Sequence, residues 1–350
     1  MKERLVKYAK YAPIVGYPLF YVFCLAVFLP LTFPYDKLRD RVVASFNADQ
    51  RASNGQQELQ IDDMSGYWLS GARVKGVRLL SLPTEPGKPP GKIEIEEASV
   101  RYGILPALIG HSDLSFHVNA FGGEASGSYD LHGNNKSVDV SLDSIDIGQV
   151  DPLVQVLGVP LHGSLGGTIR LEMPEGKASK GSGSVALEIK DVSVGDGKAK
   201  LKGAIALPRI DVGTVTLSGE AKDGTLKISK LVAGGKDVEL QGEGRVVMRE
   251  MATDSLCDAQ VRFKINDAYR SKNDMTKSLF GAPNSTMPAL FELDPKVKQS
   301  KRADGFYAWA LRGSLGRPDF SPIGGLGAGG GATMPVVPGF GAMVPKLGAQ

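Results

Sequence analysis

The sequence predicts a mainly β protein, in which a single N-terminal transmembrane helix precedes a curved, glycine-rich antiparallel sheet with a few short helices. Three observations lead to this prediction. An uncharged apolar run lies near the N-terminus, strict alternation of apolar and polar residues dominates the body, and glycine makes up 44 of the 350 residues. Ordinary proteins contain about 7% glycine, so the excess indicates many turns, bends and bulges.

The apolar run extends from Tyr11 to Tyr35 and contains 25 residues without a charge. As a helix it would measure about 37 Å, which is enough to cross a hydrocarbon core of about 30 Å. A cleaved signal peptide is the alternative, but it requires small residues at its cleavage site, and this run ends in bulky side chains. We therefore expect an uncleaved membrane anchor, whose apolar residues include Ile14, Val15, Leu19, Phe20, Val22, Phe23, Leu25, Val27, Phe28 and Leu29.

The charges before this run predict its orientation. The first ten residues carry four basic side chains and one acidic one, a net charge of +3. By the positive-inside rule the N-terminus stays in the cytoplasm, so the chain after about Pro34 lies outside it. We expect three parts: residues 1–35 as flank and anchor, residues 36–320 as a periplasmic β-rich domain, and residues 321–350 as a disordered tail rich in glycine and proline.

The body contains several runs in which apolar residues alternate with polar ones. A period of two is typical of half-buried antiparallel strands. The apolar residues in phase are Leu114, Phe116, Val118, Val138, Val140, Leu142, Val185, Leu187, Ile189, Val261, Phe263 and Ile265. Their shared face is either the closed core of a folded sheet or a partly open groove for acyl chains or an apolar partner segment, and the pattern leaves both open.

Turn and helix signals fit this layout. Phe121–Gly123, Asp196–Gly197, Asp223–Gly224 and Gly234–Gly235 separate alternating runs. Short helical segments are predicted at 104–109, 150–157 and 268–280. These segments are too few and too short to cover a large sheet.

Composition and motifs exclude several function classes. The whole chain carries a net charge of +3, which equals that of its first ten residues, so the rest is neutral and nucleic-acid binding is not expected. Cys24 and Cys257 are predicted to be small buried hydrophobic residues without a disulfide. The four histidines, His111, His117, His132 and His162, lack the spacing of a metal site. No nucleophile elbow or phosphate-binding loop is present, so we expect no enzyme activity, no metal and no cofactor.

Longer segments carry a resemblance to a known family. They are KIEIEEASVRYGILPALIGHSDLSFHVNAFGGEASGSYDL from Lys92, SLDSIDIGQVDPLVQVLGVPLHGSLGGTIRLEM, TLKISKLVAGGKDVELQGEGRV and the later GSLGRPDFSP. Behind one N-terminal anchor, this combination resembles the type II secretion system protein N family (GspN), over about Met1 to Pro322. It is also similar, more diffusely, to AsmA-like and TamB-like proteins of Gram-negative envelopes.

The resemblance implies an inner-membrane protein with its body in the periplasm, accessory to protein transport through the type II secretion system. Its partners would then be other envelope proteins of that system, docked at the free edges of the β-sheet. The AsmA-like relatives are associated with lipid movement along a curved sheet. The alternative is therefore a lipid-handling protein whose apolar groove binds acyl chains.

Overall fold

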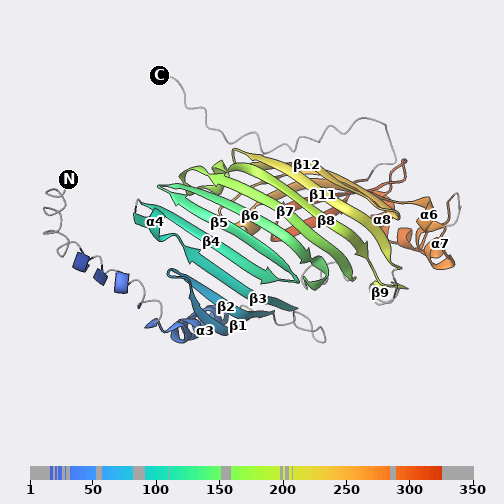
Figure 1. Ribbon diagram of the computed structural model, residues 1–350. Helices are drawn as coiled ribbons and strands as arrows, with labels where there is room; N and C mark the ends of the chain where they lie inside the picture. The colour runs from blue at the N-terminus through green and yellow to red at the C-terminus, as the bar shows by residue number, and fades with distance from the viewer. Residues whose placement is uncertain are drawn as a thin grey trace, which may run out of the picture.

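The computed structural model shows one long, curved sheet with most of its helices gathered at one end (Figure 1). It describes residues 16–18, 20, 21, 23–25, 28, 32–52, 57–81, 91–108, 110–150, 159–197, 200, 201, 205, 206, 208–283 and 289–324. The predicted mainly β fold with short helices is confirmed over these residues.

Fourteen strands pair in the order in which they follow one another in the chain, and every pair is antiparallel. The strands are β1 (Gln57–Tyr67), β2 (Gly71–Ser81), β3 (Gly91–Tyr102), β4 (His111–Ala120), β5 (Gly123–His132), β6 (Asn135–Asp146), β7 (Leu161–Met173), β8 (Ser182–Val194), β11 (Ile210–Lys222), β12 (Thr225–Gly234), β13 (Val238–Val247), β14 (Leu256–Ile265), β15 (Tyr307–Ser314) and β16 (Arg317–Pro322). Two short strands, β9 (Lys200–Leu201) and β10 (Ile205–Ala206), form a separate hairpin.

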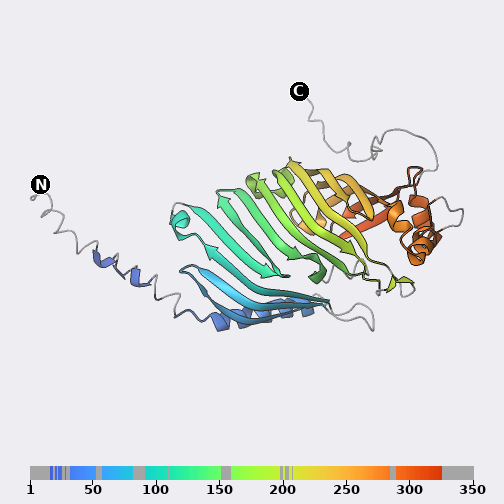
Figure 2. The same ribbon diagram turned by 45° about the vertical axis from the view of Figure 1, so that its right-hand side comes forward.

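The sheet curls strongly, so that the orange and red strands lie behind the green ones in both views (Figures 1 and 2). Register shifts interrupt six of the strand pairs, for example between His162 and Ser164 of β7 opposite β8. An extra residue in one strand increases the local twist and bends the sheet. These bulges, several of them at the glycines inside the runs, account for the predicted curvature.

The two ends of the strands differ. At one end, here called the short-turn end, most neighbouring strands join through brief connections. They include the turns at 68–70 and at Asp223–Gly224, and the helix α4 (Ile104–Leu108), which confirms the short helix expected there. At the opposite end, here called the helical end, the chain between β14 and β15 forms α6 (Asp267–Arg270), α7 (Asp274–Phe280), a 3-10 turn η5 (Leu290–Leu293) and α8 (Pro295–Ser300).

The helix predicted over 268–280 occurs as two pieces. Asn273 breaks it because its side chain accepts a hydrogen bond from the Thr276 backbone and begins α7 as a new helix. Most of the helix predicted over 150–157 lies outside the described residues. The strand β16 continues to Pro322, and residues 325–350 of the expected tail also lie outside them.

One helix was not predicted from the sequence. The segment α3 (Tyr35–Ala52) lies along β1, at the free edge of the sheet (Figure 2). The Asn47 side chain accepts a hydrogen bond from Leu59 N at 2.8 Å and donates one to Leu59 O at 3.1 Å, as a neighbouring strand would. Arg39 donates to Asp62 O at 3.0 Å. The helix therefore occupies backbone groups through which β1 could recruit another strand.

The other free edge belongs to β16. Ser321 pairs with Ala310, and Ile323 N donates to Ala308 O, so the odd-numbered residues of β16 point their backbone groups toward β15. The outward positions are then Pro318, Phe320 and Pro322. Because proline has no N–H, Phe320 alone among them carries an outward donor, and strand addition at this edge is poorly supported.

The structure describes only part of the predicted membrane anchor. Phe20, Phe23, Leu25 and Phe28 are helical and exposed, whereas Ile14, Val15, Leu19, Val22, Val27 and Leu29 lie outside the described residues. Among the residues that the structure describes, none of the helices is both long enough and apolar enough to cross a bilayer.

Candidate functional site: the inner face of the curved sheet

The apolar residues predicted from alternation share one face of the sheet, and the strand register aligns them in rows. One row crosses six neighbouring strands: Val100, Phe116, Gly127, Val140, Ile169 and Val185. The next row contains Val118, Ala125, Leu142, Gly167, Leu187, Leu217, Leu231, Gly242, Val261 and Trp309. Flanking rows hold Leu114 with Val138, and Ile189 with Phe263. The last of the set, Ile265, pairs with Val238.

This is the inner face of the curl. One buried cluster joins Val192 of β8, Val212 of β11 and Ile265 of β14 to Tyr269 and Phe280 of the helical end. β8 and β14 are separated by three strands, or about 19 Å across a flat sheet. Side chains from both strands reach the same helices because the sheet bends around them.

At the helical end the inner face is a closed core. Ile265, Tyr269 and Phe280 are 6%, 1% and 4% exposed. The Tyr269 hydroxyl donates to Pro208 O at 3.1 Å, and burial raises the pKa of this phenol to about 12. Phe291 extends the cluster to Phe263, with ring centres 6.5 Å apart. Here α6, α7 and η5 supply the second layer that a sheet needs for a dry interior.

A half-buried acid lies at the margin of this core. Glu292 accepts hydrogen bonds from the Tyr307 hydroxyl and from Lys301 Nζ, both at 2.7 Å. Burial alone would raise the pKa of Glu292, but these two donors lower it on balance. Burial and the nearby carboxylate raise the pKa of Tyr307. The proton therefore stays on the phenol, and the trio fixes η5 to β15.

Over β3 to β7 none of the described helices packs on the inner face in this way, and we call this part the open zone. In β1 to β6, Ala120 is the only buried hydrophobic residue among those described. Eleven of the twelve predicted face residues are partly exposed, and only Ile265 is buried. Val100 and Tyr102 at the margin are 39% and 37% exposed. The structure thus has a closed core at one end of the face and an uncovered apolar surface over the rest.

In the floor of the open zone an aromatic residue of β4 lies opposite a glycine of β5. Phe116 pairs with Gly127, and a Cβ built on Gly127 would lie 2.7 Å from Phe116 Cζ and 2.2 Å from Asp139 O. The ring therefore lies over the glycine, in space that a side chain would fill. Substituting Gly127 would lift the ring out of the row.

The outer face is polar. Arg73 pairs with Glu97 at 3.2 Å, His117 Nδ1 lies 3.1 Å from Glu124, and Arg170 Nε lies 2.9 Å from Asp139. Such exposed pairs contribute about 0–1 kcal/mol each, and they keep the outer surface hydrated.

The candidate chemical groups of the sequence do not assemble into a site. His111 and His132 face each other across β4 and β5, with ring centres 4.0 Å apart, but the described residues contain no cluster of three or more metal-ligating side chains. Asp143 and Asp146 bond to their own turn, accepting from Ser144 Oγ and Gly148 N. Cys24 and Cys257 are free, and burial raises the pKa of the Cys257 thiol.

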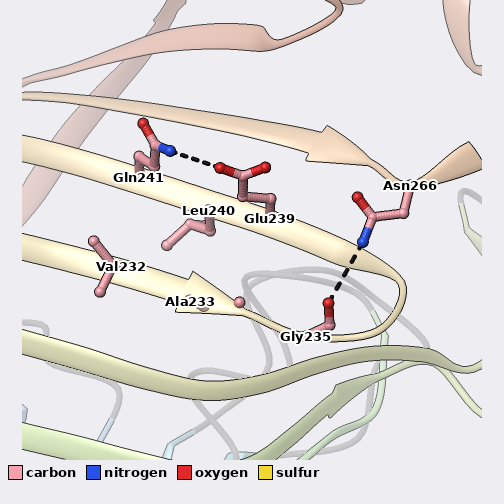
Figure 3. A pocket seen from close by; sticks show the side chains of 8 residues that line it. Val232, Ala233, Gly235, Glu239, Leu240, Gln241 and Asn266 are labelled. Carbon is pink, nitrogen blue, oxygen red and sulfur yellow. Dashed lines mark hydrogen bonds between the residues drawn. The ribbon is translucent and has the colours of Figure 1, made fainter.

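A shallow pocket of about 420 Å³ lies at the β12–β13 turn (Figure 3). Its polar side chains already bind one another and the turn. Asn266 Nδ2 donates to Lys236 O at 2.9 Å, and Gln241 Nε2 donates to Glu239 Oε1 at 2.7 Å. The pocket therefore offers few unsatisfied polar groups.

Comparison with family models, with curated proteins and with solved structures finds no match to this chain. The functional argument therefore depends on the chain's own residues and geometry.

Proposed function

We propose that this chain is an inner-membrane-anchored envelope protein whose body lies in the periplasm and holds the acyl chains of lipids on the open zone of its inner face. It acts by binding, without catalysis or a cofactor. The observation that carries this proposal is the row of apolar side chains across β3 to β7, which stays partly exposed because no described helix packs on it.

The dimensions of the open zone suit an acyl chain. Within the open zone the row runs from β3 to β7, which is four strand spacings of about 4.8 Å, or about 19 Å. An acyl chain in a bilayer spans half of a hydrocarbon core of about 30 Å. Each methylene removed from water contributes about 0.8 kcal/mol, so a ligand that follows the row can bind without any polar contact.

Contiguous apolar surface of this extent is unusual on a protein that acts alone in water. The polar outer face and the protected sheet edges leave the inner face as the favoured binding surface. A lipid ligand fits it better than a folded partner, because a flexible chain can follow a curved floor.

A matched pair of variants on one strand tests lipid binding. Val140 lies on the inner face of β6 and Ser141 on the outer face. The full-length protein, its Val140→Asp variant and its Ser141→Asp variant are purified in the same detergent, and the bound lipid is counted by mass spectrometry. We expect Val140→Asp to lose most of the bound lipid and Ser141→Asp to retain it. Equal lipid in all three proteins would refute binding on the inner face, because lipid around the anchor is common to them.

The anchor is part of the same proposal, supported by the uncharged run and its basic flank. A reporter that is active only outside the cytoplasm, fused after Pro322, should be active. A mature protein that begins near Asp36, or a reporter that works only in the cytoplasm, would contradict the anchor.

The second candidate, supported by the resemblance of the sequence, is an accessory role in type II secretion. Deleting the gene should then impair export of folded periplasmic proteins, and the protein should crosslink to inner-membrane components of that system. Docking through sheet edges is less favoured than the sequence suggested, because α3 covers β1 and two prolines interrupt the outward donors of β16. Normal secretion with altered outer-membrane lipid would favour the lipid role instead.

A further inference from the structure

Exposed apolar side chains are concentrated at the short-turn end of the sheet. Beyond α3, eleven large hydrophobic residues are exposed among those that the structure describes, and six of them belong to connections or strand ends at this end. These six are Trp68, Leu69, Tyr102, Ile104, Met251 and Leu315. Trp68 and Leu69 are the most prominent neighbours, 70% and 53% exposed at the tip of the β1–β2 turn.

The backbone holds Trp68 outward at a cost. Its φ angle is 54°, in the left-handed region that a bulky residue rarely adopts. A turn under no other requirement would carry glycine or asparagine at this position. Tryptophan gains from such exposure where its ring meets a surface that is apolar on one side and wet on the other.

Contacts join this turn to α4. Ser70 Oγ donates to Tyr102 O, and Tyr102 N donates to Ser70 O at 3.3 Å. Ile104, which is 45% exposed, begins α4 two residues after Tyr102. Trp68, Leu69 and Ile104 are therefore exposed on two neighbouring connections at this end of the sheet, and we call these three residues the rim.

The chain leaves the sheet toward its N-terminal apolar run beside the rim. The Tyr35 hydroxyl lies 3.0 Å from the position of a Cβ built on Gly66, two residues before Trp68. Phe33 packs against Tyr35 with ring centres 4.9 Å apart and is itself 44% exposed. Both views show the start of α3 and α4 at the same end of the sheet, opposite α6 and α7 (Figures 1 and 2).

We propose that the rim inserts into the interfacial layer of the membrane that holds the anchor, so that the open zone of the inner face begins at the lipid surface. This inference rests on the proposed anchor and lipid-binding face. The rim contacts a lipid surface, because the apolar run of residues 11–35 joins the sheet next to it. Aromatic side chains at such an interface have one side in hydrocarbon and the other in the hydrated headgroups.

The two tryptophans of the chain provide the test. Trp309 lies on the inner face, so Trp309→Phe leaves Trp68 as the single fluorophore, and Trp68→Phe leaves Trp309. The full-length single-tryptophan proteins are placed in phosphatidylcholine vesicles whose acyl chains carry bromine near the headgroup or near the methyl end. We expect Trp68 fluorescence to be quenched strongly by shallow bromine and weakly by deep bromine. An aqueous quencher should reduce it less than it reduces the fluorescence of free tryptophan in the same vesicle suspension.

A second pair of variants separates insertion from mere proximity. In the Trp309→Phe background, Leu69→Asp should reduce quenching by shallow bromine about twofold or more, since the charge opposes insertion of the turn. Leu293→Asp, a matched change at a leucine of the helical end that is 64% exposed against 53% for Leu69, should leave it unchanged.

The outcomes distinguish this inference from the proposed function. If Trp68 is not quenched by brominated lipid while Val140-dependent lipid still co-purifies, insertion of the rim into the membrane is refuted and lipid binding on the inner face is retained. If Trp68 is quenched but no Val140-dependent lipid is found, the rim contacts the membrane and lipid binding on the inner face is refuted. Protection of Trp68 from the aqueous quencher without quenching by bromine would show that protein covers the turn, and would overturn the proposal.

Discussion

Replacing Phe116 by arginine distinguishes an open apolar face from a closed core. Phe116 lies in the central row of the open zone, partly exposed and packed over Gly127. An arginine there can keep its aliphatic stem on the floor while its guanidinium reaches water. The matched change is Phe280→Arg, because Phe280 is 4% exposed within the helical-end core.

The expected magnitudes differ severalfold. Burying a phenylalanine contributes about 1.5–3 kcal/mol, and the arginine stem retains part of this, so Phe116→Arg should cost about 1–2 kcal/mol. That corresponds to a fall in Tm of about 2–8 °C for a domain of this size. Removing the Phe280 ring costs about 3–5 kcal/mol before the buried charge is counted. The total approaches the whole stability of a domain, about 5–15 kcal/mol.

Two measurements on the full-length protein in detergent are needed. Thermal unfolding followed by far-ultraviolet circular dichroism reports stability, and mass spectrometry reports bound lipid. Phe116→Arg should remain folded and lose lipid, Phe116→Leu should keep both, and Phe280→Arg should unfold. If Phe116→Arg unfolds as completely as Phe280→Arg, the face over β3 to β7 is covered in solution and the argument for an open zone fails.

Three further changes test other parts of the structure. Asn47→Ala removes both hydrogen bonds to Leu59, so it should destabilise the fold by about 1–2 kcal/mol. It should also promote self-association at the edge of β1, and unchanged light scattering and unfolding would exclude protection of that edge by α3. The Tyr269 phenol has its pKa raised from 10.0 to about 12, so its contribution to stability is complete below pH 10 and is lost as the pH rises through 12. Tyr269→Phe should therefore cost about 1 kcal/mol of stability at neutral pH. In denaturant titrations its free energy of unfolding should fall less steeply between pH 10 and 12 than that of the unchanged protein, and an equal fall in both proteins would contradict this. Cys257 should resist thiol reagents at neutral pH until the chain unfolds, and Cys257→Ala should cost about 1–2 kcal/mol without loss of lipid; rapid labelling of the folded protein would show that the thiol is accessible.

Local patterns in the sequence were sufficient for much of the fold. The alternation around Phe116, Val140, Val185 and Phe263 identified strands and assigned each side chain to a face, because the two-residue period of a strand is a property of the backbone alone. The Asp223–Gly224 turn was equally local, since both residues adopt positive φ and few other pairs do so readily. The apolar run at 11–35 and its basic flank predict an anchor in the same local way, and that anchor stays a prediction.

The helices were less predictable. Nothing in the local pattern of α3 marks it as the cover of β1, since none of its residues is buried and its role depends on Asn47 meeting Leu59. The break at Asn273 could have been recognised from this residue, because asparagine is among the preferred N-cap residues of a helix.

The sequence by itself determined which side chains of each strand share a face, and that this face is apolar. Only the tertiary structure decided how the faces join, because the pairing of one strand with the next depends on contacts between residues distant along the chain. It placed Phe116, Val140 and Val185 in one row, and it bent the sheet so that the helices after Ile265 pack on β8 to β15. None of the described helices packs on the inner face of β3 to β7. A period of two reports that a residue points inward, whereas the presence of a second layer depends on where distant helices pack.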